Sequence, residues 1–333
     1  MDISLSRKTQ KISLKNISES ISLEMKEFKI AYRESMRTDI FLINRISGYM
    51  STRYGKMLRP RLILLSAKLF GRTNKDTISS AVLVELLHAA TLIHDDIVDR
   101  AEYRRGIPAV HSIWKNKISV LMGDFLFSRA LSNLVRLRNY DALDVLSRTA
   151  ERMSKGELLQ MEKNRSNGMD EETYFKMISD KTASLFSASC EMGTLTTTNS
   201  VKHREAMALY GEHLGIAFQL KDDLFDFTEK KIFTGKPVGG DVKENLMTLP
   251  IINSLSNRSR KTRNIVKKLR SKKSKTEHKD ILKFVKDNGG LVYTKEKLLY
   301  HSQRAIDSLS VFNGDFDTDA LINFVQFNIE RTK

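Results

Sequence analysis

Two short acidic motifs follow apolar runs of this chain, and they constrain its fold more than any other feature. The first, at residues 95–99, reads DDIVD and follows a mostly apolar segment at 79–94. The second, at 222–226, reads DDLFD and ends a similar run. Buried carboxylates are costly unless a positive group neutralises them. Each motif must therefore lie at a surface or face a cavity that holds a cation.

Both motifs share the spacing D-D-x-x-D, which places the first and last aspartate on one face of a helix. One such motif alone is typical of an acidic surface turn. Two of them in one basic chain favour a pair of walls around a cation. Mg²⁺ usually takes one or two carboxylates together with waters and substrate phosphates. The sequence therefore predicts a magnesium–diphosphate site between six candidate metal-binding residues: Asp95, Asp96, Asp99, Asp222, Asp223 and Asp226.

The rest of the chain predicts a large, all-α, antiparallel helical bundle around a central cavity. It has only four prolines in 333 residues, and no run of alternating β-branched residues indicates a sheet. We find no linker or tandem repeat, so we expect one domain over 1–333, with 1–20 as a candidate loose tail. The expected helices are 15–36, 39–51, 59–70, 76–99, 116–138, 140–164, 171–196, 201–227, 246–256, 260–271, 277–288, 291–309 and 317–331.

A formal net charge of +16 favours anionic partners. Ten Lys or Arg and no acid occupy residues 258–275. This basic segment is typical of a solvated helix face, while a patch for acidic lipid or nucleic acid remains an alternative. It has no interleaved aromatics on which single-stranded bases could stack. We expect no nucleic-acid partner, and peripheral membrane contact stays open.

The single cysteine, Cys190, excludes an internal disulfide framework and fits a reducing compartment. No stretch of eighteen uncharged apolar residues occurs, so we expect no membrane span. The first twenty residues have no apolar signal core. We therefore expect a cytoplasmic protein.

Basic residues stand near the acidic motifs and in several candidate loops. Lys56 and Arg59 flank a helix start where Pro60 fits the first turn, and helix N-termini bind anions. Arg104 and Arg105 follow the first motif, and the planar guanidinium suits phosphate. The other candidates are Lys181 with Thr182, Lys236, and His88, which lies two turns before Asp95.

Several motifs now add up to a resemblance. In order, the chain contains GKMLRP, LLHAATLIHDDIVDRAEYRRGIPAVHSIW, LMGDFLFSRA, KGELLQ, DKTASLF, LGIAFQLKDDLFDF and TGKPVGGD. Together they resemble the trans-isoprenyl diphosphate synthases, also called the polyprenyl synthetase family, from about residue 20 to the C-terminus. The likeness is strongest to long-chain bacterial members such as octaprenyl diphosphate synthases.

The resemblance implies an isoprenoid synthase fold, a homodimer, Mg²⁺, and roles for individual residues. Asp95, Asp99 and Asp222 would hold Mg²⁺ against an allylic diphosphate. The remaining roles are divided among three groups: Arg104, Lys181 and Lys236 for that diphosphate; Lys56, Arg59, His88 and Arg105 for isopentenyl diphosphate; and Thr182, Gln219 and the Lys181 carbonyl for the allylic cation, with Phe218 against the second substrate.

Three positions depart from the family pattern. Tyr54 and Gly55 stand where a double glycine is usual, and Met57 replaces a usual basic residue. Asn245 and Leu246 stand where Gly-Lys is common, which removes one lysine that would face phosphate. We expect weaker diphosphate binding at that edge and retained activity.

The small residues Ala90 and Thr91, one turn before Asp95, favour a long product. Short-chain members of the family carry bulky aromatics there, which block the path of the growing hydrocarbon. Leu87 and Val84 lie further along the same face and are candidates for a deeper floor. The resemblance therefore implies Mg²⁺-dependent 1'-4 condensation, and the small residues favour a long-chain all-trans polyprenyl diphosphate, for use as a quinone side chain.

Four alternatives stay open at this point. A synthase of farnesyl or geranylgeranyl diphosphate would keep the chemistry and stop earlier. A non-catalytic subunit of a heteromeric synthase would be expected to lose aspartates or basic ligands, and this chain keeps both. A terpene cyclase would need one diphosphate site, whereas two sets of ligands are present. A nucleic-acid-binding protein rests on the basic segment alone.

Overall fold

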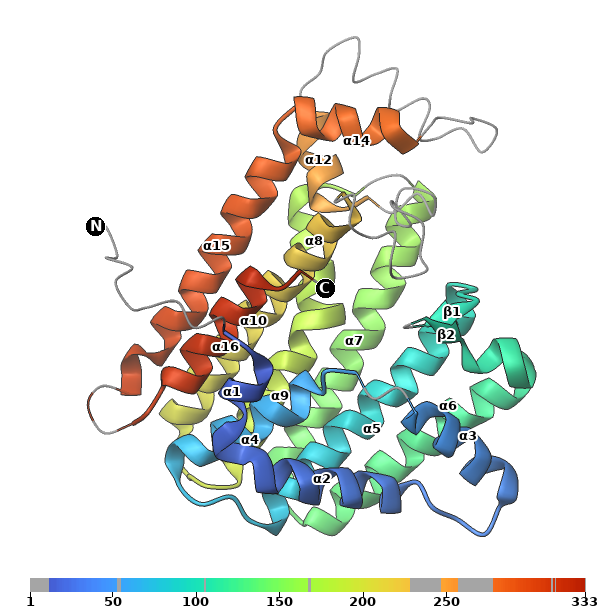
Figure 1. Cartoon of the computed structure of the whole chain (residues 1–333), viewed down its shortest axis with the longest axis vertical. Helices are drawn as coiled ribbons and strands as arrows, with labels where there is room; N and C mark the ends of the chain where they lie inside the picture. The colour runs from blue at the N-terminus through green and yellow to red at the C-terminus, as the bar shows by residue number, and fades with distance from the viewer. Residues whose placement is uncertain are drawn as a thin grey trace.

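The computed structural model of the chain describes residues 12–52, 55–104, 106–166, 169–227, 247–256, 278–312, 314 and 316–332 (Figure 1). The expected helix at 260–271, the basic segment 258–275, and the residues Tyr54, Arg105, Lys236, Asn245 and Leu246 lie outside this part of the chain. Within it, helices dominate, and the predicted all-α class is confirmed.

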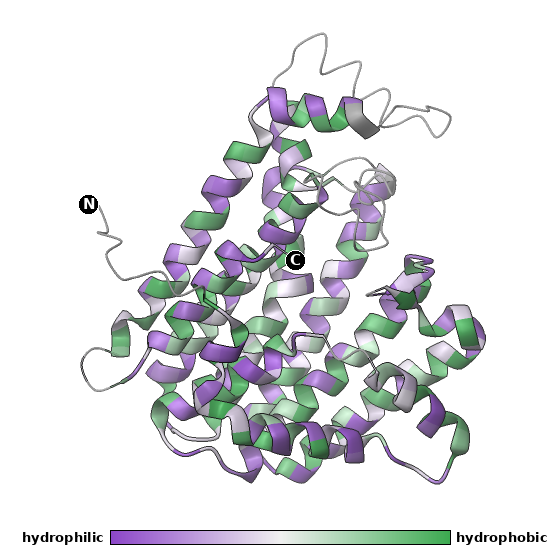
Figure 2. Ribbon diagram, in the orientation of Figure 1, coloured by the Kyte–Doolittle hydropathy of each residue, from purple (hydrophilic) through white to green (hydrophobic). Residues whose placement is uncertain are grey.

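The helices are α1 (Leu14–Ile17), η1 (Glu19–Ile21), α2 (Ser22–Ser35), α3 (Phe41–Ser51), α4 (Leu58–Phe70), α5 (Lys75–Val98), α6 (Val110–Leu137), α7 (Tyr140–Ser166), α8 (Glu171–Ile178), η2 (Ser179–Ala183), α9 (Ser184–Leu195), α10 (Val201–Asp226), α12 (Leu249–Ser256), α14 (His278–Asp287), α15 (Gly290–Ser308), η4 (Leu309–Phe312) and α16 (Asp319–Glu330). Green and purple segments alternate along them, as along α15, which is the pattern of amphipathic helices (Figure 2).

Two expected helices are divided in the structure. The range 15–36 becomes α1, η1 and α2, and it contains several serines, whose side chains compete for backbone hydrogen bonds. The range 171–196 becomes α8, the π-helical turn η2 and α9. Helix α6 starts earlier than expected, and a left-handed Lys115 (φ 69°) bends it where the sequence predicted its start.

A short hairpin corrects the expectation of no sheet. Strands β1 (Tyr103–Arg104) and β2 (Ile107–Pro108) pair antiparallel directly after α5. Gly106 supplies the positive φ of 79° that the turn requires.

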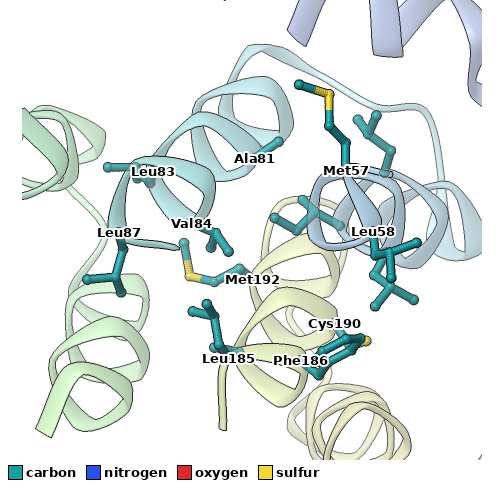
Figure 3. Close-up of a cluster of buried hydrophobic side chains, with 14 of the residues drawn as sticks. Met57, Leu58, Ala81, Leu83, Val84, Leu87, Leu185, Phe186, Cys190 and Met192 are labelled. Carbon is teal, nitrogen blue, oxygen red and sulfur yellow. The ribbon is translucent and has the colours of Figure 1, made fainter. Parts of the chain in front are cut away.

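Helix α5 is the central element of the bundle. Asn74 and Thr77 form a reciprocal capping box at its start, with the Thr77 amide donating to Asn74 Oδ1 at 3.0 Å. Its apolar residues are buried against α2, α4, α6 and α9. Figure 3 shows Val84 and Leu87 on α5, with Leu185 and Met192 of α9 facing Val84. The helix therefore runs through the core and ends at the first acidic motif, with Asp99 at its C-terminus.

Two helices, α5 and α6, are long and apolar enough by composition to cross a membrane, although the sequence led us to expect none. The relevant window of α5 is 61% buried inside the protein, as in the core helix of a soluble protein. That of α6 is only 33% buried, which leaves an apolar face on the surface of this chain.

A histidine pair joins α10 to α15. His213 Nδ1 and His301 Nδ1 lie 3.0 Å apart, so one ring donates and the other accepts. The His301 ring also stacks on Phe175. Burial, followed by the charges of His213, Lys297 and Arg304, lowers the pKa of His301 to about 4.

This shift predicts an acid-sensitive contribution to stability. Because unfolded His301 titrates near 6.5 and folded His301 near 4, the unfolded chain binds more protons between these values. The free energy of unfolding should then fall by on the order of 2 kcal/mol as the pH drops through this window, after allowance for partial solvent exposure. Urea unfolding of the wild type and His301→Asn from pH 7 to 4.5 measures it. Parallel curves for the two proteins would contradict the assignment.

Candidate active site

The two acidic motifs lie at the C-terminal ends of α5 and α10 and meet at one cavity. Asp99 from the first motif and Asp223 from the second both line it. Lys181, Thr182 and Gln219 line the same cavity. The structure thus brings together acidic, cationic and amide groups that are far apart in the sequence.

The first motif divides its carboxylates between two faces of α5. Burial raises the pKa of Asp95 to about 6, and Glu157 and Asp99 add to the rise, while Lys181 and Arg104 oppose it. Asp96 lies on another face, is 4% exposed, and accepts a hydrogen bond from Arg104 Nε at 2.6 Å. A cation near Asp95 would therefore favour the charged form of Asp95. Asp96 is already paired with a cation, the guanidinium of Arg104.

The second motif is also divided. Asp223 is buried and accepts hydrogen bonds from the Tyr174 hydroxyl and from Gln219 Nε2, the latter at 2.9 Å. Asp222 is more exposed and pairs with Arg331 Nη1 at 2.8 Å. Asp226 is 4% exposed. Asp222 is thus the most accessible carboxylate of this motif.

Lys181 and Thr182 come from the π-helical turn η2. Lys181 Nζ forms an ion pair with Glu157 and donates to Gln160 Oε1 at 2.9 Å, both on α7. Thr182 Oγ1 donates to Gln219 Oε1 at 3.1 Å. The lysine therefore stands at the cavity wall with its charge already oriented, and the hydroxyl and amide oxygens lie beside it.

A second group of predicted residues surrounds two aromatic rings that contact each other at a tilt. Arg59 Nη1 lies 3.0 Å from His88 Nε2, and the Arg59 guanidinium covers the Phe186 ring at 4.9 Å. Phe218 packs on Phe186 with ring centroids 5.1 Å apart. Burial, followed by the charge of Arg331, lowers the pKa of Lys56, which places the two cations near one another.

His88 also lines a separate cavity beside α5. The hairpin closes one side of it, and Met36, directly after α2, and Met50 of α3 supply apolar side chains. Asp96 and Arg104 contribute its polar end. The structure thus places Arg104 in an ion pair at this second cavity, while its predicted role toward the allylic diphosphate stays a prediction.

Four residues near the site were not assigned a role from the sequence. Glu157 and Gln160 lie within the quoted segment KGELLQ, three residues apart, so their shared helix face was readable. Tyr174 gave no signal beyond an aromatic at helical spacing. Arg331 lies at the end of the chain and contacts α10 only through the fold, donating to the Phe218 carbonyl at 2.9 Å.

The donor set suits a metal that binds together with its substrate. Within the described ranges, no three His, Cys, Asp or Glu side chains gather closely enough to hold a metal ion by themselves. The cavity is instead lined by one carboxylate from each motif, Asp99 at the end of α5 and Asp223 near the end of α10. Mg²⁺ takes few carboxylates and completes its octahedron with waters and phosphates, which fits this arrangement.

The Tyr174–Asp223 contact predicts a measurable loss of stability. Tyr174→Phe leaves a 1% exposed carboxylate without one donor, which should cost about 1–3 kcal/mol in the free energy of unfolding. Urea unfolding measures the loss. Tyr293→Phe is the matched control, because that hydroxyl donates to Glu171 at a less buried position, at 2.7 Å. Equal losses in both variants would contradict the interpretation.

Comparison with known proteins identifies the family. A family model described as polyprenyl synthetase matches residues 41–287. An octaprenyl diphosphate synthase of Escherichia coli is 29% identical over 97% of this chain and 100% of that protein. A short chain isoprenyl diphosphate synthase of Methanothermobacter thermautotrophicus is 33% identical over 86% of this chain and 90% of that protein.

The solved structures agree. A polyprenyl synthase of Caulobacter crescentus, crystallised with calcium and isoprenyl diphosphate, matches with a TM-score of 0.90 and 29% identity. The match covers 98% of this chain and 100% of that one, and it confirms the predicted isoprenoid synthase fold. The chain belongs to the polyprenyl synthetase family.

Proposed function

We propose that this protein condenses isopentenyl diphosphate with an allylic diphosphate to make a long-chain all-trans polyprenyl diphosphate. One observation supports it above all: Asp99 and Asp223 face a single cavity together with Lys181, Thr182 and Gln219. A diphosphate needs cations, and a departing one leaves an allylic cation that needs oxygen dipoles. Both kinds of group line this cavity.

We further propose Mg²⁺ as the metal, held by Asp95, Asp99 and Asp222. The calcium in the Caulobacter crescentus synthase crystal supports a divalent cation, and the carboxylate set supports a hard one. When bound, Mg²⁺ would neutralise the diphosphate and make it a better leaving group.

The residues of the chain then divide the work. Lys181 binds the allylic diphosphate, and its contact with Glu157 and Gln160 fixes the direction of its ammonium group. Thr182 Oγ1 and the Gln219 amide oxygen stabilise the allylic cation through their dipoles. The alkene of isopentenyl diphosphate attacks that cation, and the released diphosphate accepts the proton lost from the product.

The second substrate has its own set of side chains. Arg59 and His88 lie in contact, and Lys56 lies near Arg331, so three or four cations could surround one diphosphate. Phe218 lies over the same region and would pack on the isoprene unit. We also propose the roles that the resemblance implies for two further residues: Lys236 would bind the allylic diphosphate, and Arg105 would bind isopentenyl diphosphate.

The product length follows from α5. Ala90 is 1% exposed and small, and Thr91 donates its hydroxyl to the His88 carbonyl, so neither side chain projects far. Leu87 and Val84 lie deeper and are buried in the main core cluster. The growing chain would pass the small residues and meet its floor at this second pair or beyond it. Shorter products remain the main alternative.

A product assay tests the function directly. The purified protein is incubated with Mg²⁺, farnesyl diphosphate and labelled isopentenyl diphosphate, and the dephosphorylated products are sized. A ladder ending at a long polyprenol is the expected result. A stop at geranylgeranyl would favour the shorter-chain alternative, and no product would favour a non-catalytic subunit.

The same assay tests the path of the product. Ala90→Phe should shorten the longest product by at least one isoprene unit, because the ring fills the space beside α5 while the ligands around the cavity are unchanged. Leu209→Phe is the control, since that side chain is 46% exposed on α10. An identical ladder from Ala90→Phe and the wild type would exclude this path.

We also propose that the protein is a homodimer, with α6 as the contact helix. Val120, Phe127, Leu131 and Val135 share one face of α6 and are 37–70% exposed. Exposed apolar stripes of this length mark interaction surfaces. A second copy is the occupant that we favour, because the stripe runs along a long helix that can pack on its own symmetry mate.

Mutation of this stripe tests the dimer. The double variant Leu131→Lys, Val135→Lys should sediment as a monomer of 38.1 kDa, whereas the wild type sediments at twice that mass. Leu23→Lys, Ile30→Lys on α2 is the matched control, because those side chains are 67% and 64% exposed. A dimer in the α6 variant, or a monomeric wild type, would contradict the proposal.

The cytoplasmic location remains a proposal that rests on cysteine usage. Cys190 is fully buried, and burial raises the pKa of its thiol to about 12, so it is protected from oxidation. Membrane contact through the basic segment lies outside the described residues.

A further inference from the structure

The turn that carries Lys181 and Thr182 is unusual because it is π-helical. The Ser184 amide donates to the Ser179 carbonyl, five residues back, so the turn holds one residue more than an α-helical turn. One residue rotates side chains by about 100° around a helix axis. The π register therefore decides which way Lys181 and Thr182 point.

Arg152 on α7 contacts this turn through two of its three guanidinium nitrogens. Nε donates to Asp180 at 2.8 Å, and Nη2 donates to the Ser179 hydroxyl at 2.8 Å and to the Ser179 carbonyl at 3.2 Å. The Ser179 carbonyl is the acceptor of the five-residue hydrogen bond itself. Arg152 thus binds the two residues that begin the π turn.

The same guanidinium anchors the turn to α10. Nη1 and Nη2 donate to Glu212 Oε2 and Oε1 at 3.1 and 2.8 Å, and the Ser179 hydroxyl donates to Glu212 as well. Both carboxylates are 19% exposed, so water screens the pairs only in part. Planar, bidentate geometry of this kind is specific to arginine.

Close backbone contacts hold the turn from two sides. A Cβ on Gly156 of α7 would lie 2.5 Å from the Lys181 nitrogen, and one on Gly215 of α10 would lie 2.5 Å from the Ala183 Cα. Gly156 is one turn after Arg152, and Gln160, which contacts Lys181 Nζ, is one turn further. One face of α7 therefore supports the turn from Ser179 to Lys181, and α10 supports it at Ala183.

We propose that Arg152 is a positioning residue for the reaction: it holds the π-helical register of residues 179–183 and thereby aims Lys181 and Thr182 at the cavity. The inference rests on the proposed function for its kinetic consequence. Its structural consequence, a locked π turn, stands on the contacts alone. Arg152 is not among the residues that line the cavity, so it acts through Lys181 and Thr182.

Hydrogen exchange and kinetics test this together. In Arg152→Met, the amides of residues 180–184 should exchange at least tenfold faster than in the wild type, while those of α5 are unchanged. The KM for the allylic diphosphate should rise about tenfold or more, since small displacements of a positioning group have effects of this size. The KM for isopentenyl diphosphate should stay within about twofold, because Arg59 and His88 are untouched.

Two further variants make the result decisive. Arg152→Lys should recover only part of the loss, because one ammonium cannot bridge Asp180 and Glu212 in a plane. Arg148→Met removes an exposed pair with Asp144 on the same helix and should match the wild type in every readout. Unchanged exchange at 180–184, or equal rises in both KM values, would overturn the proposal. A wild-type protein without turnover would contradict the proposed function. The hydrogen-exchange data would still show whether Arg152 holds the π turn.

Discussion

The burial of charged carboxylates is the constraint on which the rest of this structure depends. Two acidic motifs end at one cavity, and each must remain partly charged in a poorly solvated place. The fold answers by giving two buried carboxylates a cation or donors of their own: Arg104 for Asp96, and Tyr174 with Gln219 for Asp223. The charged form of Asp95 remains destabilised, because burial raises the pKa of this carboxyl to about 6. A cation that enters the cavity would stabilise that form.

Much of this was readable from the sequence because it is local. The D-D-x-x-D spacing, the apolar runs before it and the low proline content predict helices that end at a cavity, and α5 and α10 end within a residue or two of the expected positions. The KGELLQ segment even carried Glu157 and Gln160 on one face. An apolar pattern with a period of 3.6 residues predicts a helix and its buried face, because side chains at that spacing lie on one side of any α-helix.

What the sequence did not predict depends on contacts between distant segments or on a single inserted residue. Arg331 pairs with Asp222 although it lies 109 residues later in the chain, and nothing near either residue indicates the pair. The π turn looks helical in sequence, since DKTASLF has ordinary helical composition, and its register comes from Arg152 and two glycines on neighbouring helices. The hairpin after α5 is too short for a strand pattern to show.

The same close packing bears on product length. Val84 and Leu87 are 0% and 4% exposed, so a hydrocarbon that grows past Ala90 enters space that core side chains already fill. Burying each CH₂ of the product stabilises it by about 0.8 kcal/mol, or roughly 4 kcal/mol for a five-carbon unit. Moving side chains out of a dense core costs about 1–3 kcal/mol for each position that must repack. Elongation would stop where one more unit requires more repacking than its burial offsets, so the floor is set by how readily the residues around α5 and α9 move as well as by their size.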